Sequence, residues 1–201
     1  MSLTDVEIVA AIDAEIGSTM AALASSALKI GWFNEGVQNM AHRNGRFKPK
    51  THDITWSAAA RSVTLNTDFI ALDKITTTAG YRSQPWRVFG ETLVLDDSDG
   101  ASEDGAARVY YWAEWPLLTI SPSSTSGLTY HEDYVVKDFA LSRFYKLLAS
   151  NRLYYKRYAT MVGQNAVSAG DLQNEADRYY QDYLDGQEHT LRQPPALFYE
   201  G

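Results

Sequence analysis

The residues that most often do chemistry in proteins are scattered along this 201-residue chain. Cysteine is absent, which excludes disulfides and thiolate metal sites. No histidine stands three or four residues from another, as paired metal ligands on a helix often do. We therefore predict surface or capping roles for His42, His52, His131 and His189. Phosphate-binding glycine loops and the nucleophile elbow are also missing, so we predict no enzyme, no metal and no cofactor.

Glu114 is the most interesting single carboxylate, because it lies within the aromatic segment Trp112–Trp115. A carboxylate enclosed by tryptophans can have a raised pKa and serve as a general acid. However, strand alternation would place Glu114 and Trp115 on opposite faces, and nothing in the sequence supplies a second acid. We predict that Glu114 is not catalytic, and a hydrolase that uses it stays as a remote alternative.

A run of acidic and turn-forming residues extends from Asp96 to Asp104 between two predicted strands. Its carboxylates are Asp96, Asp97, Asp99, Glu103 and Asp104. The spacing fails the calcium-loop pattern, because Leu95 stands where the first aspartate would be. The run therefore predicts an exposed hairpin loop with a negative local potential, and weak calcium binding is the lesser alternative.

Basic and aromatic residues interleave in the C-terminal part of the chain. They are Arg143, Lys146, Arg152, Lys156, Arg157, Tyr154 and Tyr158. Such a mixture can bind nucleic acid through phosphate contacts and stacking, or it can pair with an acidic surface on a neighbouring subunit. The formal net charge of −7 argues against a general nucleic-acid binder, so we favour a subunit interface.

The segment after Gln187 loses helical periodicity and is stiffened by two prolines. It contains Gln193, Pro194, Pro195, Leu197, Phe198 and Tyr199. An aromatic end on an extended segment is typical of a peptide that docks into a groove of a partner. The alternative, a tail that folds back onto its own domain, is equally compatible with the sequence.

Helices are predicted at both ends of the chain. Capping boxes at Thr4–Glu7 and Thr129–Glu132 mark two helix starts. The first helix has isoleucines every four residues and a predicted stop at Gly17, and the run from Ser18 to Ala24 favours neither loop nor helix. A second helix is expected over 26–44. The C-terminal helices are expected within 129–185, with a break near Asn151.

Between residues 51 and 116 the pattern changes to the alternation of strands. The predicted strands are His52–Trp56, Ser62–Leu65, Phe69–Thr78, Trp86–Phe89, Thr92–Leu95 and Ala107–Trp115. The order predicts one α+β domain over 1–186, a bundle of N- and C-terminal helices with an inserted antiparallel sheet or hairpin region. An extended tail would follow over 187–201. No apolar run reaches the ~20 residues of a membrane span, and the acidic N-terminus predicts no secretory signal.

This order of motifs resembles that of the head-to-tail adaptor proteins of tailed bacteriophages, the connector, gatekeeper or tail tubular protein A-like family. The resemblance covers roughly Asp5 to Leu184. It rests on the segments Trp32–Glu35, Arg43–Phe47, Asp53–Trp56, Asn66–Ile70, Glu91–Asp97 and Val109–Tyr111, followed by Trp115–Leu118. Where the family often has a proline before the aspartate of its strand motif, this chain has Thr67.

The resemblance implies a structural virion protein at the head-to-tail junction, made in the host cytoplasm before assembly. It would form a ring of twelve copies, bind the portal protein above and a neck, tail or nozzle protein below, and line the DNA exit channel. The tail from Gln193 to Gly201 would bind the portal. The loop from Asp96 to Asp104 would face the channel and repel phosphate, so that DNA passes without specific binding. Another neck or tail protein, such as a tail completion or tube-end protein, is the alternative.

Overall fold

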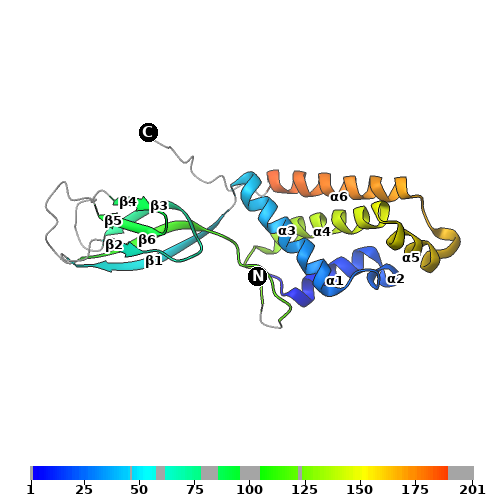
Figure 1. The fold of residues 1–201 in the computed structure, drawn as a ribbon, viewed down its shortest axis with the longest axis horizontal. Helices are drawn as coiled ribbons and strands as arrows, with labels where there is room; N and C mark the ends of the chain where they lie inside the picture. The colour runs from blue at the N-terminus through cyan, green and yellow to red at the C-terminus, as the bar shows by residue number, and fades with distance from the viewer. Residues whose placement is uncertain are drawn as a thin grey trace. The chain divides into compact units, whose positions relative to one another are not determined.

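The structure is a computed structural model that describes residues 2–45, 47–57, 62–77, 86–95, 105–121 and 124–189. Helices and antiparallel strands are both present, which confirms the predicted α+β class. We expected one domain, whereas the chain forms two compact units (Figure 1). The helical unit comprises Met1–Arg46 and Trp115–Gly201, and the strand unit comprises Phe47–Glu114.

The first helix, α1 (Asp5–Ile16), begins at the predicted capping box. The Glu7 N–H donates to the Thr4 hydroxyl at 3.3 Å, and the Thr4 N–H donates to the Glu7 carboxylate at 2.8 Å. The helix ends at Gly17, whose φ of 79° suits a residue without a Cβ. The chain then forms the short helix α2 (Ser18–Ala21), in the segment whose sequence favoured neither loop nor helix.

Helix α3 (Ser26–Asn44) has the bounds that the sequence predicts. Its N-terminus is capped by Ser25, whose hydroxyl accepts the Leu28 N–H at 3.3 Å. Its C-terminal stop is Gly45, which adopts the left-handed conformation with a φ of 64°. Both ends are therefore specified by residues within one turn of the boundary.

The C-terminal helices are α4 (Tyr130–Ser150), α5 (Arg152–Val162) and α6 (Ala169–His189), with the 3₁₀ turn η1 (Gly163–Asn165) before α6. The capping box at Thr129 and the break at Asn151 are confirmed. Helix α6, however, continues through residues that we assigned to the extended tail. The Gln187 side chain is buried there, so packing of this last turn explains the longer helix.

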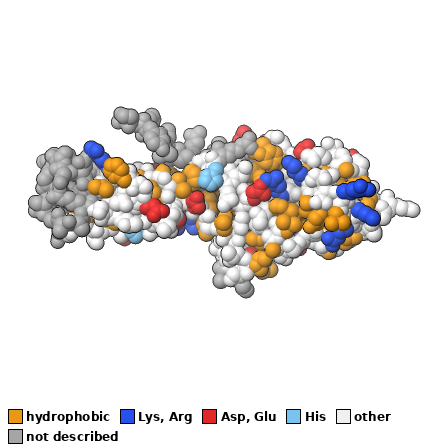
Figure 2. All heavy atoms as spheres, in the orientation of Figure 1, with side chains coloured by type: hydrophobic (Ala, Val, Ile, Leu, Met, Phe, Trp, Pro, Cys, Tyr) orange, Lys and Arg blue, Asp and Glu red, His pale blue; other side chains and the backbone are white. Residues whose placement is uncertain are grey.

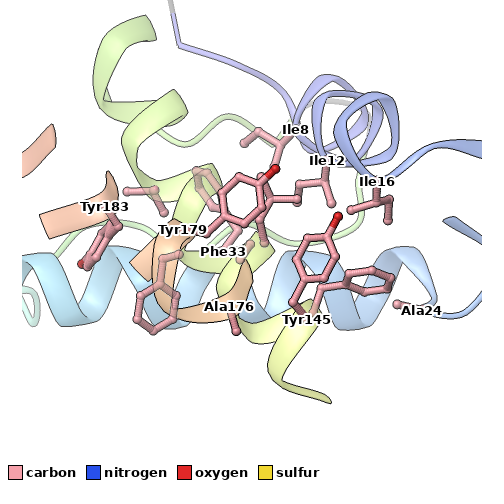
Figure 3. Packing of buried hydrophobic residues seen from close by; sticks show 14 of the residues in the cluster. Ile8, Ile12, Ile16, Ala24, Phe33, Tyr145, Ala176, Tyr179 and Tyr183 are labelled. Atoms are coloured by element: carbon pink, nitrogen blue, oxygen red, sulfur yellow. The ribbon is translucent and has the colours of Figure 1, made fainter. Parts of the chain in front are cut away.

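One apolar cluster holds the helical unit together, and α4 is its central helix, in contact with α1, α3, α5 and α6. Figure 3 shows how the isoleucines of α1 meet aromatic rings from the other helices. Tyr145 of α4 stacks on Tyr179 of α6 with ring centroids 5.5 Å apart and planes at 9°. The residues that Figure 3 labels are Ile8, Ile12, Ile16, Ala24, Phe33, Tyr145, Ala176, Tyr179 and Tyr183.

Two glycines let the neighbouring helices approach α4 closely. A Cβ on Gly36 of α3 would lie 3.0 Å from a methyl carbon of Val136. A Cβ on Gly186 of α6 would lie 2.8 Å from a methyl carbon of Val135. Because real carbon contacts are longer, any side chain at Gly186 would push α6 away from α4.

The strand unit contains two three-stranded antiparallel sheets. The first has the order β1 (Lys48–Trp56), β6 (Gly105–Ala113) and β3 (Phe69–Thr77). The second has the order β2 (Ser62–Thr64), β5 (Thr92–Leu95) and β4 (Trp86–Phe89). A separate apolar cluster lies in this unit: Ile54, Trp56, Leu65, Leu93, Ala107, Val109, Tyr111 and Ala113.

Two of the three nine-residue strands of the first sheet, β1 and β6, are displaced from their predicted bounds. Strand β1 begins at Lys48 rather than His52, and β6 covers Gly105–Ala113 rather than Ala107–Trp115. Pairing explains both shifts, because the ladder runs from Lys48 opposite Ala113 to Trp56 opposite Gly105. The Trp56 ring lies where a Cβ on residue 105 would be, so glycine is required at that end.

Candidate interaction surfaces

Asn34 of α3, a residue of the resemblance, anchors the segment that leads from residue 115 to α4. Its amide nitrogen donates to the Leu118 carbonyl at 2.9 Å, and its amide oxygen accepts the Leu118 N–H at 2.9 Å. Leu118 is buried, so the amide satisfies both backbone groups of a segment outside any helix or strand. The role of Asn34 in the helical unit is therefore structural.

Asp68, from the Asn66–Ile70 motif, is the centre of a polar cluster in the strand unit. The Asn66 amide donates to the Tyr111 hydroxyl at 2.7 Å, and that hydroxyl donates to the Asp68 carboxylate at 3.3 Å. Lys50 of β1 forms an ion pair with the same carboxylate. The cluster links β1 and β6 to the turn before β3, so its role is also structural.

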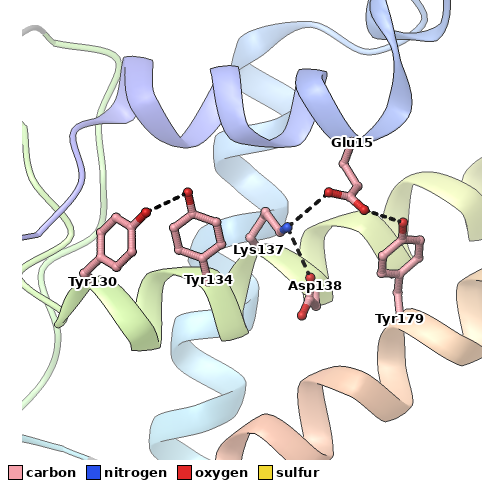
Figure 4. Close-up of polar contacts among 6 residues, drawn as sticks. All are labelled: Glu15, Tyr130, Tyr134, Lys137, Asp138 and Tyr179. Carbon is pink, nitrogen blue, oxygen red and sulfur yellow. Dashed lines mark hydrogen bonds and ion pairs between the residues drawn. The ribbon is translucent and has the colours of Figure 1, made fainter.

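A polar network in the helical unit joins α1, α4 and α6 (Figure 4). The Lys137 ammonium lies 3.5 Å from the Glu15 carboxylate and 3.6 Å from that of Asp138. The Tyr179 hydroxyl donates to Glu15 at 3.2 Å. Tyr130 and Tyr134, one turn apart on α4, lie beside the network with their hydroxyls 3.1 Å apart. The network thus ties three helices together through groups that can change protonation.

Burial raises the pKa of Asp138 to about 6, and the nearby Asp182 and Glu15 add to this effect while Lys137 opposes it. Burial also raises the pKa of Tyr179 above its usual range, so its hydroxyl stays protonated and donates to Glu15. These groups are bonded to one another rather than directed at an open site. The arrangement is that of a structural network whose stability depends on pH.

The structure separates the predicted basic and aromatic interface residues. Arg143 is engaged within the helical unit, where it pairs with Glu35 and lies 5.2 Å from the Phe139 ring centroid. Tyr158 is buried, and its hydroxyl accepts the Val167 N–H at 3.1 Å. Tyr158 therefore belongs to the core and not to the surface that we predicted, because its ring lies on the inner side of α5.

The other basic residues are exposed, three on α5 and Lys146 near the end of α4. No carboxylate of the described residues forms an ion pair with any of them. The Arg157 guanidinium lies 5.9 Å from the ring centroid of Tyr154, which is half-buried. Figure 2 shows Lys and Arg side chains gathered over the end of the helical unit that carries α5. We define the basic face of α5 as Arg152, Lys156 and Arg157.

The structure shows a second charged surface, on α6, which we did not predict from the sequence. Arg178 is the only lysine or arginine of this helix, and it pairs with Glu175 at 2.7 Å. Carboxylates recur along the exposed side at spacings of three to five residues, a signal that was present in the sequence. We define the acidic face of α6 as Asp177, Asp182, Asp185 and Glu188.

Glu114 is exposed just beyond the end of β6 and is not enclosed by tryptophans. The burial on which the general-acid hypothesis depended is therefore missing. His42 and His131 are exposed, and His52 is half-buried. The predicted acidic loop, residues 96–104, and the predicted portal-binding residues of the tail, within 193–199, lie outside the described residues.

Among the residues that the structure describes, no group of three His, Asp or Glu side chains could hold a metal ion. Within the same ranges, none of the helices has the length and apolar content that a membrane span requires. The charged faces of α5 and α6 are thus the most distinctive candidate sites on the described surface. Comparison with protein-family models gave no match to this chain, and comparison with curated proteins gave none either.

Proposed function

We propose that this chain is a structural virion protein, a head-to-tail adaptor that joins the portal of a tailed phage to its neck or tail. The observation that carries the proposal is the order of elements. Helices α1 to α3 precede the strand unit, and helices α4 to α6 follow it. This is the order on which the resemblance to the adaptor family rests, and Asn34 and Asp68 of its motifs have defined structural partners.

The geometry of the helical unit suits an assembly protein. Helices from both ends of the chain share one apolar cluster, so the unit is a self-contained block that can pack against neighbours. Its exposed helix faces carry charges that have no ion-pair partner among the described residues. Unpaired charged faces of opposite sign favour specific contacts between proteins.

In this proposal the helices form a bundle with an inserted sheet, and twelve copies form a ring beneath the portal. The tail from Gln193 to Gly201 binds the portal protein, and a neck, tail or nozzle protein binds below. The loop from Asp96 to Asp104 faces the channel, where its carboxylates repel phosphate and let DNA pass without specific binding. The protein would then be located at the head-to-tail junction of the virion.

Electron microscopy of the full chain mixed with the portal protein from the same genome tests this proposal. We expect added ring density on one end of the portal. A chain that lacks residues 193–201 should stay folded, because α6 ends at His189, but should no longer associate. Replacing Leu197, Phe198 and Tyr199 by serine should have the same effect, whereas Arg192→Ala, the matched control just outside this segment, should retain binding.

Each outcome has a separate meaning. Co-assembly of the truncated chain with the portal would show that the tail is not the portal-binding element. Failure of the full chain to bind any portal, together with binding to a purified tail-tube end, would replace the adaptor proposal with the tail-completion alternative. Binding to neither would overturn both.

A further inference from the structure

We infer that the basic face of α5 docks against the acidic face of α6 in a second copy of this chain. The inference rests on the proposed function and deepens it, because it names the two surfaces that would join neighbouring subunits. The two faces are opposite in charge, exposed, and without ion-pair partners among the described residues.

The two helices have opposite charge although they are consecutive in the chain. Helix α5 has three basic residues and no carboxylate. Helix α6 has Arg178 as its only basic residue apart from His189, against the carboxylates Asp171, Glu175, Asp177, Asp182, Asp185 and Glu188. Positive charge is therefore concentrated on α5 and negative charge on α6, so the two helices are complementary in charge.

The arrangement of residues on α5 places these charges on one side. The inner side carries Tyr158, which is buried, and the half-buried Tyr154 and Tyr155. The outer side carries the basic face together with Leu153 and Met161, which are 64% and 43% exposed. Two apolar side chains among three cations provide the apolar centre and polar rim that are typical of a protein interface.

The charges of both faces are available to a partner. In the described part of the chain, no residue of the basic face of α5 pairs with a carboxylate of α6. Asp177 and Asp185 accept hydrogen bonds from Gln173 and Gln181 at 2.9 and 2.7 Å, but these donors are neutral. A cation from another copy can therefore approach either carboxylate without breaking an ion pair.

A second copy explains these observations better than a nucleic acid does. The formal net charge of −7 opposes binding to a polyanion, and the basic face has too few cations to offset it. A second copy presents negatively charged carboxylates on the acidic face of α6, where the helix fixes their positions. Charge complementarity of this kind gives orientation and selectivity.

The way in which the two faces pair determines the symmetry of the assembly. Two faces of opposite sign can pair twice in a two-fold dimer or once, head-to-tail; a ring requires the head-to-tail contact, which leaves one face of each kind free on every dimer. Repetition of such a contact closes into a ring or extends as a filament, which is the assembly that an adaptor ring requires. Exposed charge pairs are screened by salt, so association should weaken as ionic strength increases.

Cysteine cross-linking tests the contact directly, because the natural chain contains no cysteine. We would mix Lys156→Cys protein with Asp177→Cys protein, oxidise the mixture and separate the products, with and without portal rings. We expect a disulfide-linked heterodimer only in the mixture. The matched control replaces Asp177→Cys with Thr119→Cys, which is exposed elsewhere in the helical unit and should give no specific product.

Charge reversal provides the second arm, measured as self-association by sedimentation at low salt. Lys156→Glu with Arg157→Glu should weaken association on the order of tenfold or more, as should Asp177→Lys with Asp185→Lys. Mixing the two double variants should restore it. Lys74→Glu with Arg108→Glu changes the net charge equally within the strand unit and should have no effect.

The inference would be overturned if no disulfide formed between positions 156 and 177 of the two variants, in either the presence or the absence of portal. It would also be overturned if the α5 charge reversal abolished binding to duplex DNA while self-association stayed unchanged. Portal binding without this cross-link would reject the interface but not the adaptor proposal. The cross-link without portal binding would reject the adaptor proposal but not the interface.

Discussion

The helical unit and the strand unit are built from the chain in different ways. The helical unit depends on contacts between distant segments, such as the Leu3 N–H with Asp133 and the Tyr183 hydroxyl with the Gly36 carbonyl. The strand unit is one continuous segment, and its first sheet places β6 between β1 and β3. The helical unit therefore requires both ends of the chain before it can form, whereas the strand unit has all its partners within residues 47–114.

The two units also differ in whether their ion pairs are buried or exposed. In the helical unit, the ammonium of buried Lys29 lies 2.5 Å from Asp13 and donates to the Ala21 carbonyl at 2.9 Å. In the strand unit, Arg108 and Asp53 pair in solvent with more than half of each side chain exposed. The comparison predicts that changes in the helical unit alter stability strongly, while surface changes in the strand unit are tolerated.

The largest expected effect comes from removing a central ring of the helical unit. Phe144 is fully buried and packs edge-on against Trp32 and Tyr145. Phe144→Ala should lower the free energy of unfolding by about 3–5 kcal/mol in urea denaturation, because it leaves a cavity. Leu93→Ala, the matched change in the strand unit, should cost roughly 2–5 kcal/mol. Hydrogen exchange should localise each loss to its own unit, and equal loss of protection in both would show that they unfold as one.

A smaller effect is expected where α6 approaches α4. Gly186→Ala would place a methyl group 2.8 Å from a carbon of Val135, so the two helices must separate. We expect a loss of about 1–3 kcal/mol, measured by thermal or urea denaturation. Gly170→Ala is the control, because its added methyl meets only the Ser168 hydroxyl at 3.6 Å. An equal loss of stability in the Gly186→Ala and Gly170→Ala variants would contradict the close approach of α6 to α4.

The polar network predicts a pH effect in the helical unit. The raised pKa of Asp138, about 6 against an ordinary 3.8, means that the folded chain holds this proton more tightly than the unfolded chain. The resulting stabilisation is present below about pH 4 and is lost as the pH rises through 6. Asp138→Asn should therefore remove about 1–2 kcal/mol of the stability difference between pH 4 and pH 7. Urea denaturation at several pH values measures this, and an unchanged pH profile would exclude Asp138 as the cause.

The smallest effect is expected for the exposed ion pair of the strand unit. The Arg108 guanidinium lies 2.6 Å from Asp53 and lowers the pKa of that carboxyl, but both side chains are in solvent. Arg108→Ala should leave the thermal midpoint unchanged, because surface pairs contribute little. Lys29→Ala in the helical unit should clearly lower the thermal midpoint. A marked loss of stability in the Arg108 variant would contradict the proposed difference between the units.

The sequence predicted the candidate site only in part. Arg152, Lys156 and Arg157 could be selected because three basic residues close together are rarely buried. Tyr158 was assigned to the same surface, and nothing local distinguishes it from Tyr154, since a tyrosine can pack inward or outward. The acidic face of α6 was overlooked because we read its carboxylates singly instead of on a helix.

The features that follow from the sequence alone are those whose cause lies within one helical turn. The capping boxes at Thr4 and Thr129, the stop at Gly45 and the break at Asn151 all depend on neighbouring residues, so their signals are local. These features marked the helices, and the alternation within residues 51–116 added the strands that complete the α+β class.

Which surfaces are covered depends on contacts that form only when the chain has folded. The place of β6 in the middle of its sheet, the inward ring of Tyr158 and the last turn of α6 all depend on partners far away in the sequence. Asn34 and Leu118, which are 84 positions apart, illustrate the point. An amide on a helix shows no sign of its partner, because the hydrogen bond exists only after the chain has brought the two segments together. The exposure of the α5 and α6 faces, on which the proposed subunit contact depends, is a property of the same kind.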